Sequence, residues 1–198
     1  HDRALRHRGR AGLACAALLD EALPRDRAFL RICNIAAVAD FGLAPTDIPA
    51  LAGGALVTTT LGARPVETLQ PGIALVTVGG GRPPLRWIER RPRLCLGRSA
   101  PILLRASYFG LEKDICVTPE TRVARSGPMV EYLFGVEHVL VRAGDMIASP
   151  GAQRDRTTAV RYFYPLMFDD HACVAVDRCG VESALLSDVI AAGDAGGP

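Results

Sequence analysis

The 198-residue sequence lacks several patterns that identify whole classes of protein. None of its six cysteines is spaced as C-x-x-C, and no Cys/His cluster has the ligand spacing of a zinc site. No apolar run reaches the roughly 18 residues of a membrane-spanning helix, because Asp, Arg or Pro interrupts each one. The formal net charge of +2 is too small to indicate a nucleic-acid or anionic-membrane partner. We therefore expect no metal, no other cofactor, no nucleic acid and no membrane.

Two further features have ordinary structural interpretations. The Gly79–Gly81 run lacks the Lys-Ser/Thr pair and the following helix of a phosphate loop, so it is interpreted as a hairpin turn. The cysteines stand among apolar neighbours, which predicts buried thiols instead of a disulfide framework. Unpaired cysteines favour a cytoplasmic setting, but the sequence leaves secretion and the oligomeric state open.

The sequence is rich in residues that interrupt regular secondary structure, with 20 glycines and 14 prolines. Short β-rich runs between these residues predict many short strands and therefore an all-β fold. The expected strands are residues 56–60, 73–78, 85–90, 101–105, 114–118, 137–142, 161–168 and 172–176. Residues 65–69 and 143–147 are expected to form helical turns, and residues 129–134 either a strand or a short helix.

The composition changes along the chain. Residues 1–49 are predicted to form a helical N-terminal appendage and a linker, because Ala/Leu-rich runs precede a proline-flanked stretch. The β domain is expected at residues 50–186 and a flexible Gly/Ala-rich tail at residues 187–198. The chain begins with His1 instead of Met, which indicates a fragment or a trimmed product.

The most distinctive motif is the stretch Gly54–Gly72. It combines a β-rich run, a turn at Gly62, the segment Pro65-Val-Glu-Thr-Leu69 and a Pro71-Gly72 corner. This stretch resembles the opening motif of bacterial Hint (hedgehog/intein) domains. Later stretches continue the resemblance in order, at residues 84–88, 102–106, 117–123, 168–171 and 182–183. The resemblance covers about residues 50–186 and implies a compact, horseshoe-like all-β fold of two related halves.

The resemblance also implies an activity, namely autoprocessing by self-cleavage, as in protein splicing. In the active family a Cys at the head of the first strand attacks the preceding carbonyl and forms a thioester by an N-to-S acyl shift. The Thr of a Thr-x-x-His motif orients the scissile peptide, and its His protonates the departing amide nitrogen. These residue types suit the reaction, because a thiol is a good nucleophile near neutral pH and imidazole exchanges protons there.

The sequence departs from this pattern at both reactive positions. The nucleophile position falls at Ala50, and no Cys, Ser or Thr between Thr46 and Thr58 offers a substitute. Thr118 is retained, but Thr121 stands at the position of the motif histidine. Methyl and hydroxyl groups cannot replace a thiolate and an imidazole. Losing either partner is therefore expected to cost orders of magnitude in rate.

A few other residues remain as candidates, each with a structural alternative. His171 and Thr118 are the candidate catalytic residues. The structural alternative for His171 is a corner histidine hydrogen-bonded to the backbone, and for Thr118 it is a structural turn residue. Cys116 is a possible substitute nucleophile, although a buried thiol is normally inert. His138 is interpreted as a surface strand residue, and Asp169-Asp170 as a polar corner.

The leading hypothesis is a Hint protein that is not competent for self-cleavage. It would act as a structural or peptide-interaction module, with its own polypeptide or a peptide partner in the cleft. The alternative is an autoprocessing domain that uses an N-to-S or N-to-O acyl shift with unorthodox residues such as Thr118, Cys116 or His171. A vestigial site requires Thr118, His171 and the chain near Ala50 to lie within hydrogen-bonding reach of one another.

Overall fold

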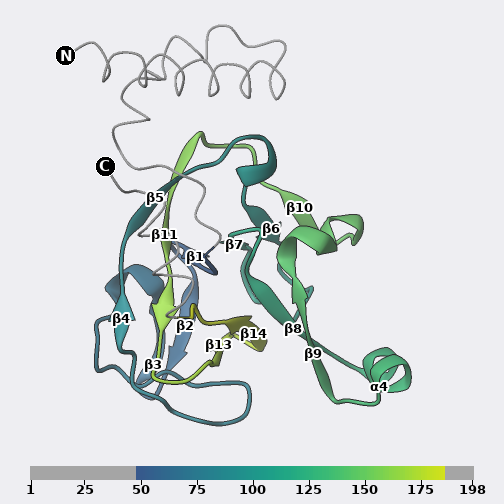
Figure 1. Ribbon diagram of the computed structural model, residues 1–198, viewed down its shortest axis with the longest axis horizontal. Helices are drawn as coiled ribbons and strands as arrows, with labels where there is room; N and C mark the ends of the chain where they lie inside the picture. Colours follow the sequence, from purple (N-terminus) through teal and green to yellow (C-terminus); the bar gives the residue numbers. More distant parts are fainter. Residues whose placement is uncertain (1–47, 186–198) are drawn as a thin grey trace, which may run out of the picture.

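The computed structural model of the chain describes residues 48–185, which are mostly β-structure (Figure 1). The helices expected within residues 1–47, Cys15, Cys33 and the tail beyond residue 185 lie outside the described residues. The described part contains fourteen short strands and one α-helix, so the prediction of an all-β fold is confirmed.

The elements follow one another closely along the chain. The strands are β1 (Leu51–Ala52), β2 (Leu56–Thr59), β3 (Gly62–Pro65), β4 (Trp87–Ile88), β5 (Arg91–Leu94), β6 (Ile102–Leu104), β7 (Ile115–Val117), β8 (Arg122–Ser126), β9 (His138–Arg142), β10 (Ala152–Arg154), β11 (Val160–Tyr164), β12 (Leu166–Met167), β13 (Cys173–Val176) and β14 (Cys179–Glu182). The helix is α4 (Pro128–Phe134), and the 3₁₀ turns are η1 (Val66–Thr68), η2 (Gly97–Ser99) and η3 (Ala143–Ala148).

Two six-stranded sheets carry most of the fold. Their strand orders are β10-β6-β7-β1-β11-β5 and β3-β2-β13-β14-β8-β9, and β12 pairs separately with β4. The long β8–β9 hairpin runs away from the body of the domain and carries α4 at its tip (Figure 1). On α4 the apolar side chains of Met129, Tyr132, Leu133 and Phe134 are exposed.

The distinctive stretch Gly54–Gly72 forms the β2–β3 hairpin and η1. Thr59 pairs with Gly62 across a tight turn, and the Thr59 hydroxyl donates a 2.7 Å hydrogen bond to the Gly62 carbonyl. The backbone φ of +106° at Gly62 lies in the region that favours glycine, which explains the residue at this turn. The helical turn expected at residues 65–69 is η1, where Val66 is fully buried.

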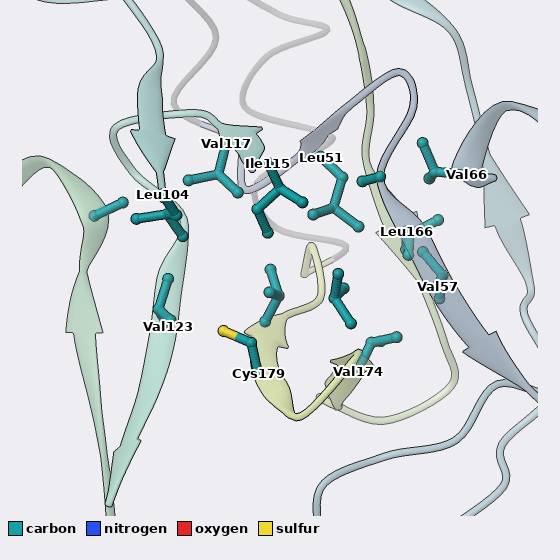
Figure 2. Packing of buried hydrophobic residues seen from close by; sticks show 14 of the residues in the cluster. Leu51, Val57, Val66, Leu104, Ile115, Val117, Val123, Leu166, Val174 and Cys179 are labelled. Carbon is teal, nitrogen blue, oxygen red and sulfur yellow. The ribbon is translucent and has the colours of Figure 1, made fainter. Parts of the chain in front are cut away.

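A single large core joins the two six-stranded sheets. Leu51, Leu104 and Val117 extend from the first sheet, and Val57 and Val174 from the second, toward a common centre (Figure 2). A smaller buried cluster on the first sheet contains Ala50, Ala52, Cys95, Cys116 and Phe163. The residues at the head of the first strand, 48–50, are therefore already buried against the packed sheet.

Several elements differ from the expectations. The stretch 73–78 pairs only through isolated bridges, one of them between Ala74 and Pro84, because a proline has no N–H with which to continue a ladder. The strand expected at residues 85–90 is reduced to β4. The strands β5, β10 and β14 were not predicted, since Arg, Pro, Gln and Gly in them hide the alternating apolar pattern.

The helical option for residues 129–134 is confirmed. The helix α4 begins at Pro128, whose fixed φ suits the first helical turn. It ends at Gly135, which adopts a left-handed φ of +66°. The Gly79–Gly81 run is a turn as expected, closed by a 2.9 Å hydrogen bond from the Gly80 amide to the Thr77 carbonyl.

Candidate functional site

The residues that precede β1 lie against the turn that follows β7. Leu51 pairs with Val117, and the Thr118 amide donates a 3.1 Å hydrogen bond to the Ala50 carbonyl. The chain then turns tightly, with the Thr121 amide donating to the Thr118 carbonyl at 3.1 Å. This turn directs both threonine side chains at the backbone of residues 48–50.

The two threonine hydroxyls bind backbone groups on either side of Pro49 in the incoming chain. The Thr118 hydroxyl donates to the Ile48 carbonyl at 3.0 Å. The Ala50 amide donates to Thr121 Oγ1 at 3.0 Å, with Thr118 Oγ1 at 3.3 Å. The two hydroxyls lie 2.8 Å apart. If Thr121 donates to Thr118, every one of these groups has a partner. We call Ile48, Ala50, Thr118 and Thr121 the threonine site.

The threonine site is dry and bears no charge. Thr118 and Thr121 are 1% and 0% exposed, and Ala50 presents only a methyl group. A threonine hydroxyl does not titrate near neutral pH, so it cannot deliver a proton to an amide nitrogen as imidazole does. The geometry can orient a peptide, but it contains neither a thiol nor a proton donor of suitable pKa.

His171 belongs to a different hydrogen-bond network. Its Nε2 atom lies 3.0 Å from the Glu182 Oε1 atom, and the same buried carboxylate accepts a 2.8 Å bond from Arg122. A carboxylate and not the backbone is therefore the partner of this corner histidine, which corrects the structural alternative given above. Within residues 48–185, no hydrogen bond or ion pair joins His171 to the threonine site. The predicted convergence is thus present for Thr118 and Ala50 but not for His171.

Cys116 also has its own partners. Its sulfur donates to an Asp155 oxygen at 3.4 Å and accepts from Arg161 at 2.6 Å, and Arg161 pairs with Asp155 at 2.8 Å. We call these three residues the cysteine cluster. Burial raises the pKa of the Cys116 thiol to about 12, and Asp155 adds to the rise while Arg161 opposes it. At neutral pH this sulfur is a protonated thiol, which is a weak nucleophile.

The other candidates lie outside the threonine site. The remaining described cysteines, 95, 173 and 179, also have pKa values raised by burial, to about 11, 11 and 12. His138 is exposed on β9 as expected, 3.9 Å from Glu137. Asp169 pairs with Arg86 at 2.7 Å, which agrees with a polar corner.

Within the described part, no group of three or more His, Cys, Asp or Glu residues is placed to hold a metal ion. No described helix is long and apolar enough to cross a membrane.

Sequence reasoning missed the partners of the candidates. Asp155 and Arg161 follow Cys116 by about forty residues in the chain, and neither stands in a recognisable motif. The Ile48 carbonyl carries no sequence signal beyond the extended backbone that a following proline favours. A pairing prediction between β1 and β7 would have brought the contacts of the threonine site to notice, and the contacts of Cys116 would also have needed the pairing of β11 with β1.

Two inteins are among the solved structures to which the chain is similar. A DnaB intein from Synechocystis sp. PCC 6803 is 11% identical with a TM-score of 0.44, and the match covers 70% of this chain and 99% of the intein. A splice-inactive variant of the AceL NrdHF class 3 split intein is 15% identical with a TM-score of 0.39, covering 69% and 99%. No curated protein matches the sequence.

Comparison with protein families is more informative. Residues 49–188 match the Hint domain family, which is well over half of the 198-residue chain. The match begins beside the threonine site, and it includes both six-stranded sheets. The chain therefore belongs to the Hint domain family.

Proposed function

We propose that this Hint domain does not cleave itself and serves as a structural module that holds its own polypeptide in the Hint cleft. The observation that carries the proposal is the 3.0 Å hydrogen bond from the Ala50 amide to the Thr121 hydroxyl. The resemblance places the departing nitrogen of the family reaction at this amide and the proton-donating histidine at Thr121. A neutral hydroxyl occupies the place of the acid.

The nucleophile is lacking in the same way. The position from which a thiol would attack the preceding carbonyl holds the methyl group of Ala50, which packs in the smaller buried cluster. Nucleophile and acid act as a unit in such reactions, so removing both leaves little of the rate. The retained contacts of Thr118 fix the peptide but supply no step of bond breakage.

The unorthodox residues are poor replacements. The Thr118 hydroxyl donates its proton to the Ile48 carbonyl, and no described base accepts that proton instead. Cys116 shares the smaller buried cluster with Ala50, but its pKa of about 12 keeps it protonated at neutral pH. His171 hydrogen-bonds Glu182, outside the threonine site.

The chain's own residues 48–50 are the peptide that best fits the threonine site. Residues 48–50 already use the polar groups of both threonines, and these three residues are buried. A peptide partner would have to displace this buried segment and replace its hydrogen bonds to both threonines, each worth about 0.5–1.5 kcal/mol. We therefore favour the chain's own polypeptide over a separate peptide.

The test is a chain of residues 1–198 with a different tag at each end, incubated with and without dithiothreitol and followed by intact-mass spectrometry. We expect only the full-length mass in both samples. A product cut between Pro49 and Ala50, and accelerated by the thiol, would refute the proposal and establish the autoprocessing alternative. A matched Thr118→Val chain would then show whether the retained threonine takes part.

A further inference from the structure

A second polar site is formed at the β8–β9 hairpin by residues outside the threonine site. A hollow of about 300 Å³ is bounded by β8, β9, the loop 107–110 and the β13–β14 turn. Its polar lining comes from Arg125, Ser126, His138 and Arg178. We call these four residues with their enclosing loops the cationic hollow. No carboxylate lines it.

The two arginines are available to a ligand. Arg178 is exposed, and its side chain makes no hydrogen bond or ion pair with any residue in 48–185. The Arg125 guanidinium stacks over the Phe109 ring at 4.5 Å, which fixes its position without using its N–H groups. Ser126 pairs with His138 across the β8–β9 ladder, so these two side chains lie side by side on one face of the hairpin.

The backbone around the hollow is unusually constrained. Ser107, Phe109 and Asp177 are the only non-glycine residues in 48–185 with positive φ, and all three stand in its two enclosing loops. For a bulky residue such as Phe109, a φ of +57° is strained. Such strain persists where the surrounding structure enforces it, commonly at ligand sites.

Specific contacts enforce this geometry. The Arg178 amide donates to the Gly110 carbonyl at 3.2 Å, and the Glu112 amide donates to an Asp177 carboxylate oxygen at 3.0 Å. A side chain at Gly110 would place its Cβ 2.9 Å from the Arg178 Cβ, so the glycine permits the close approach of the two loops. The Asp177 carboxylate, although near the hollow, is thus engaged with the backbone of the loop.

We propose that the cationic hollow binds a phosphate group, either free phosphate or a phosphate monoester. Two permanently charged guanidiniums match the charge of about −1.5 to −2 on a monoester near neutral pH. Guanidinium N–H groups, the Ser126 hydroxyl and the His138 ring offer donors to several phosphate oxygens, more than a carboxylate can use. The site shares no residue with the threonine site and does not depend on the proposed function.

The test is a titration of the full chain with sodium phosphate and with phenyl phosphate, against sodium chloride at matched ionic strength. NMR amide shifts locate the site, and calorimetry gives the Kd. We expect saturable binding with shifts at Arg125, Ser126, His138 and Arg178. Tighter binding of phenyl phosphate would identify a monoester as the ligand, and equal or weaker binding would identify free phosphate.

Two variants and a matched control keep the test decisive. Arg178→Gln removes an exposed charge that supports no other contact, and we expect it to weaken binding about tenfold, as for a lost charge-assisted hydrogen bond. Arg125→Gln is expected to act similarly. Arg142→Gln, an exposed arginine on β9 outside the hollow, is expected to leave the Kd unchanged. Binding that does not saturate, or an equal loss in Arg142→Gln and Arg178→Gln, would overturn the proposal.

Discussion

The threonine site and the cysteine cluster meet near the end of β7 and differ in what each one lacks. Thr118 immediately follows β7, and Cys116 stands within it. The threonine site holds the peptide at the family's reaction position but offers only a methyl group and hydroxyls. The cysteine cluster contains a thiol beside an arginine, but burial, with a smaller contribution from Asp155, keeps that thiol protonated although Arg161 opposes the rise in its pKa.

Under the proposed function, this difference separates position from reactivity, because the peptide is held in one cluster and the thiol lies in another. Self-cleavage requires a nucleophile, an acid and a held peptide at one point, and the threonine site supplies only the held peptide. Its hydroxyl–backbone hydrogen bonds stabilise the entry of the chain into the sheet, which under the proposed function is the reason that they are kept.

The largest expected effect comes from restoring the chemistry at the threonine site. The double variant Ala50→Cys with Thr121→His supplies the nucleophile and the acid where the peptide is already held. We expect dithiothreitol-dependent cleavage before residue 50, faster by orders of magnitude than any background in the original chain. Intact-mass spectrometry over time measures it.

The single variants are the controls for this experiment. Ala50→Cys alone lacks the acid and Thr121→His alone lacks the nucleophile, so each is expected to remain near background. If Thr121→His alone cleaved as fast as the double variant, the nucleophile would lie elsewhere and the separation of position from reactivity would fail.

The next effect concerns stability. Thr118→Val keeps the shape of the side chain but leaves the buried Ile48 carbonyl without its donor, and we expect a loss of about 2 kcal/mol in unfolding free energy. Thr121→Val should cost less, about 1 kcal/mol, because the Ala50 amide retains Thr118 Oγ1 nearby. Urea unfolding measures both changes.

Thr158→Val serves as the matched control, since Thr158 is exposed and makes no described contact. It should change the unfolding free energy by no more than about 0.5 kcal/mol. Equal losses in all three valine variants would show that the threonine site contributes no specific hydrogen bonding.

A smaller effect is expected from pH at the cysteine cluster. Burial raises the pKa of Cys116 from 9.0 to about 12, so the folded state holds this proton more tightly than the unfolded state. The resulting stability is complete below about pH 9 and is lost as the pH rises toward 12. Urea unfolding at about pH 8 and about pH 10 should therefore show a fall in stability, reduced in Cys116→Val. An identical fall of stability in Cys116→Val would show that groups other than Cys116 cause it.

The smallest effect is expected at His171. Its side chain is 38% exposed, so the contact with Glu182 is screened by solvent. His171→Gln should change the unfolding free energy by less than about 1 kcal/mol and leave cleavage by the double variant unchanged. A large loss of that cleavage in His171→Gln would show that His171 takes part in the reaction.

The sequence alone predicted much of this fold. The Gly62 turn, the Pro65–Leu69 helical turn and the β-rich runs at β2, β9 and β13 obey local rules, because glycine conformation and β-propensity need no distant partner. The strands β5 and β10 were missed because only their tertiary neighbours make them strands.

The candidate site was predictable in part for a similar reason. The motif positions of Ala50, Thr118 and Thr121 follow from order in the chain, and the structure places them together. The separation of His171 from them, and the engagement of Cys116 by Asp155 and Arg161, depend on contacts between residues far apart in sequence. No periodicity or spacing encodes those contacts.

Hydroxylamine trapping of the unaltered chain tests the central claim most directly, because hydroxylamine cleaves a thioester or an oxyester whichever residue formed it. The dual-tagged chain of residues 1–198 is incubated with hydroxylamine and its mass is followed to long times. We predict that only the full-length mass persists. A hydroxamate-bearing fragment that ends at residue 49 would contradict the claim that this Hint domain has lost its acyl-shift chemistry.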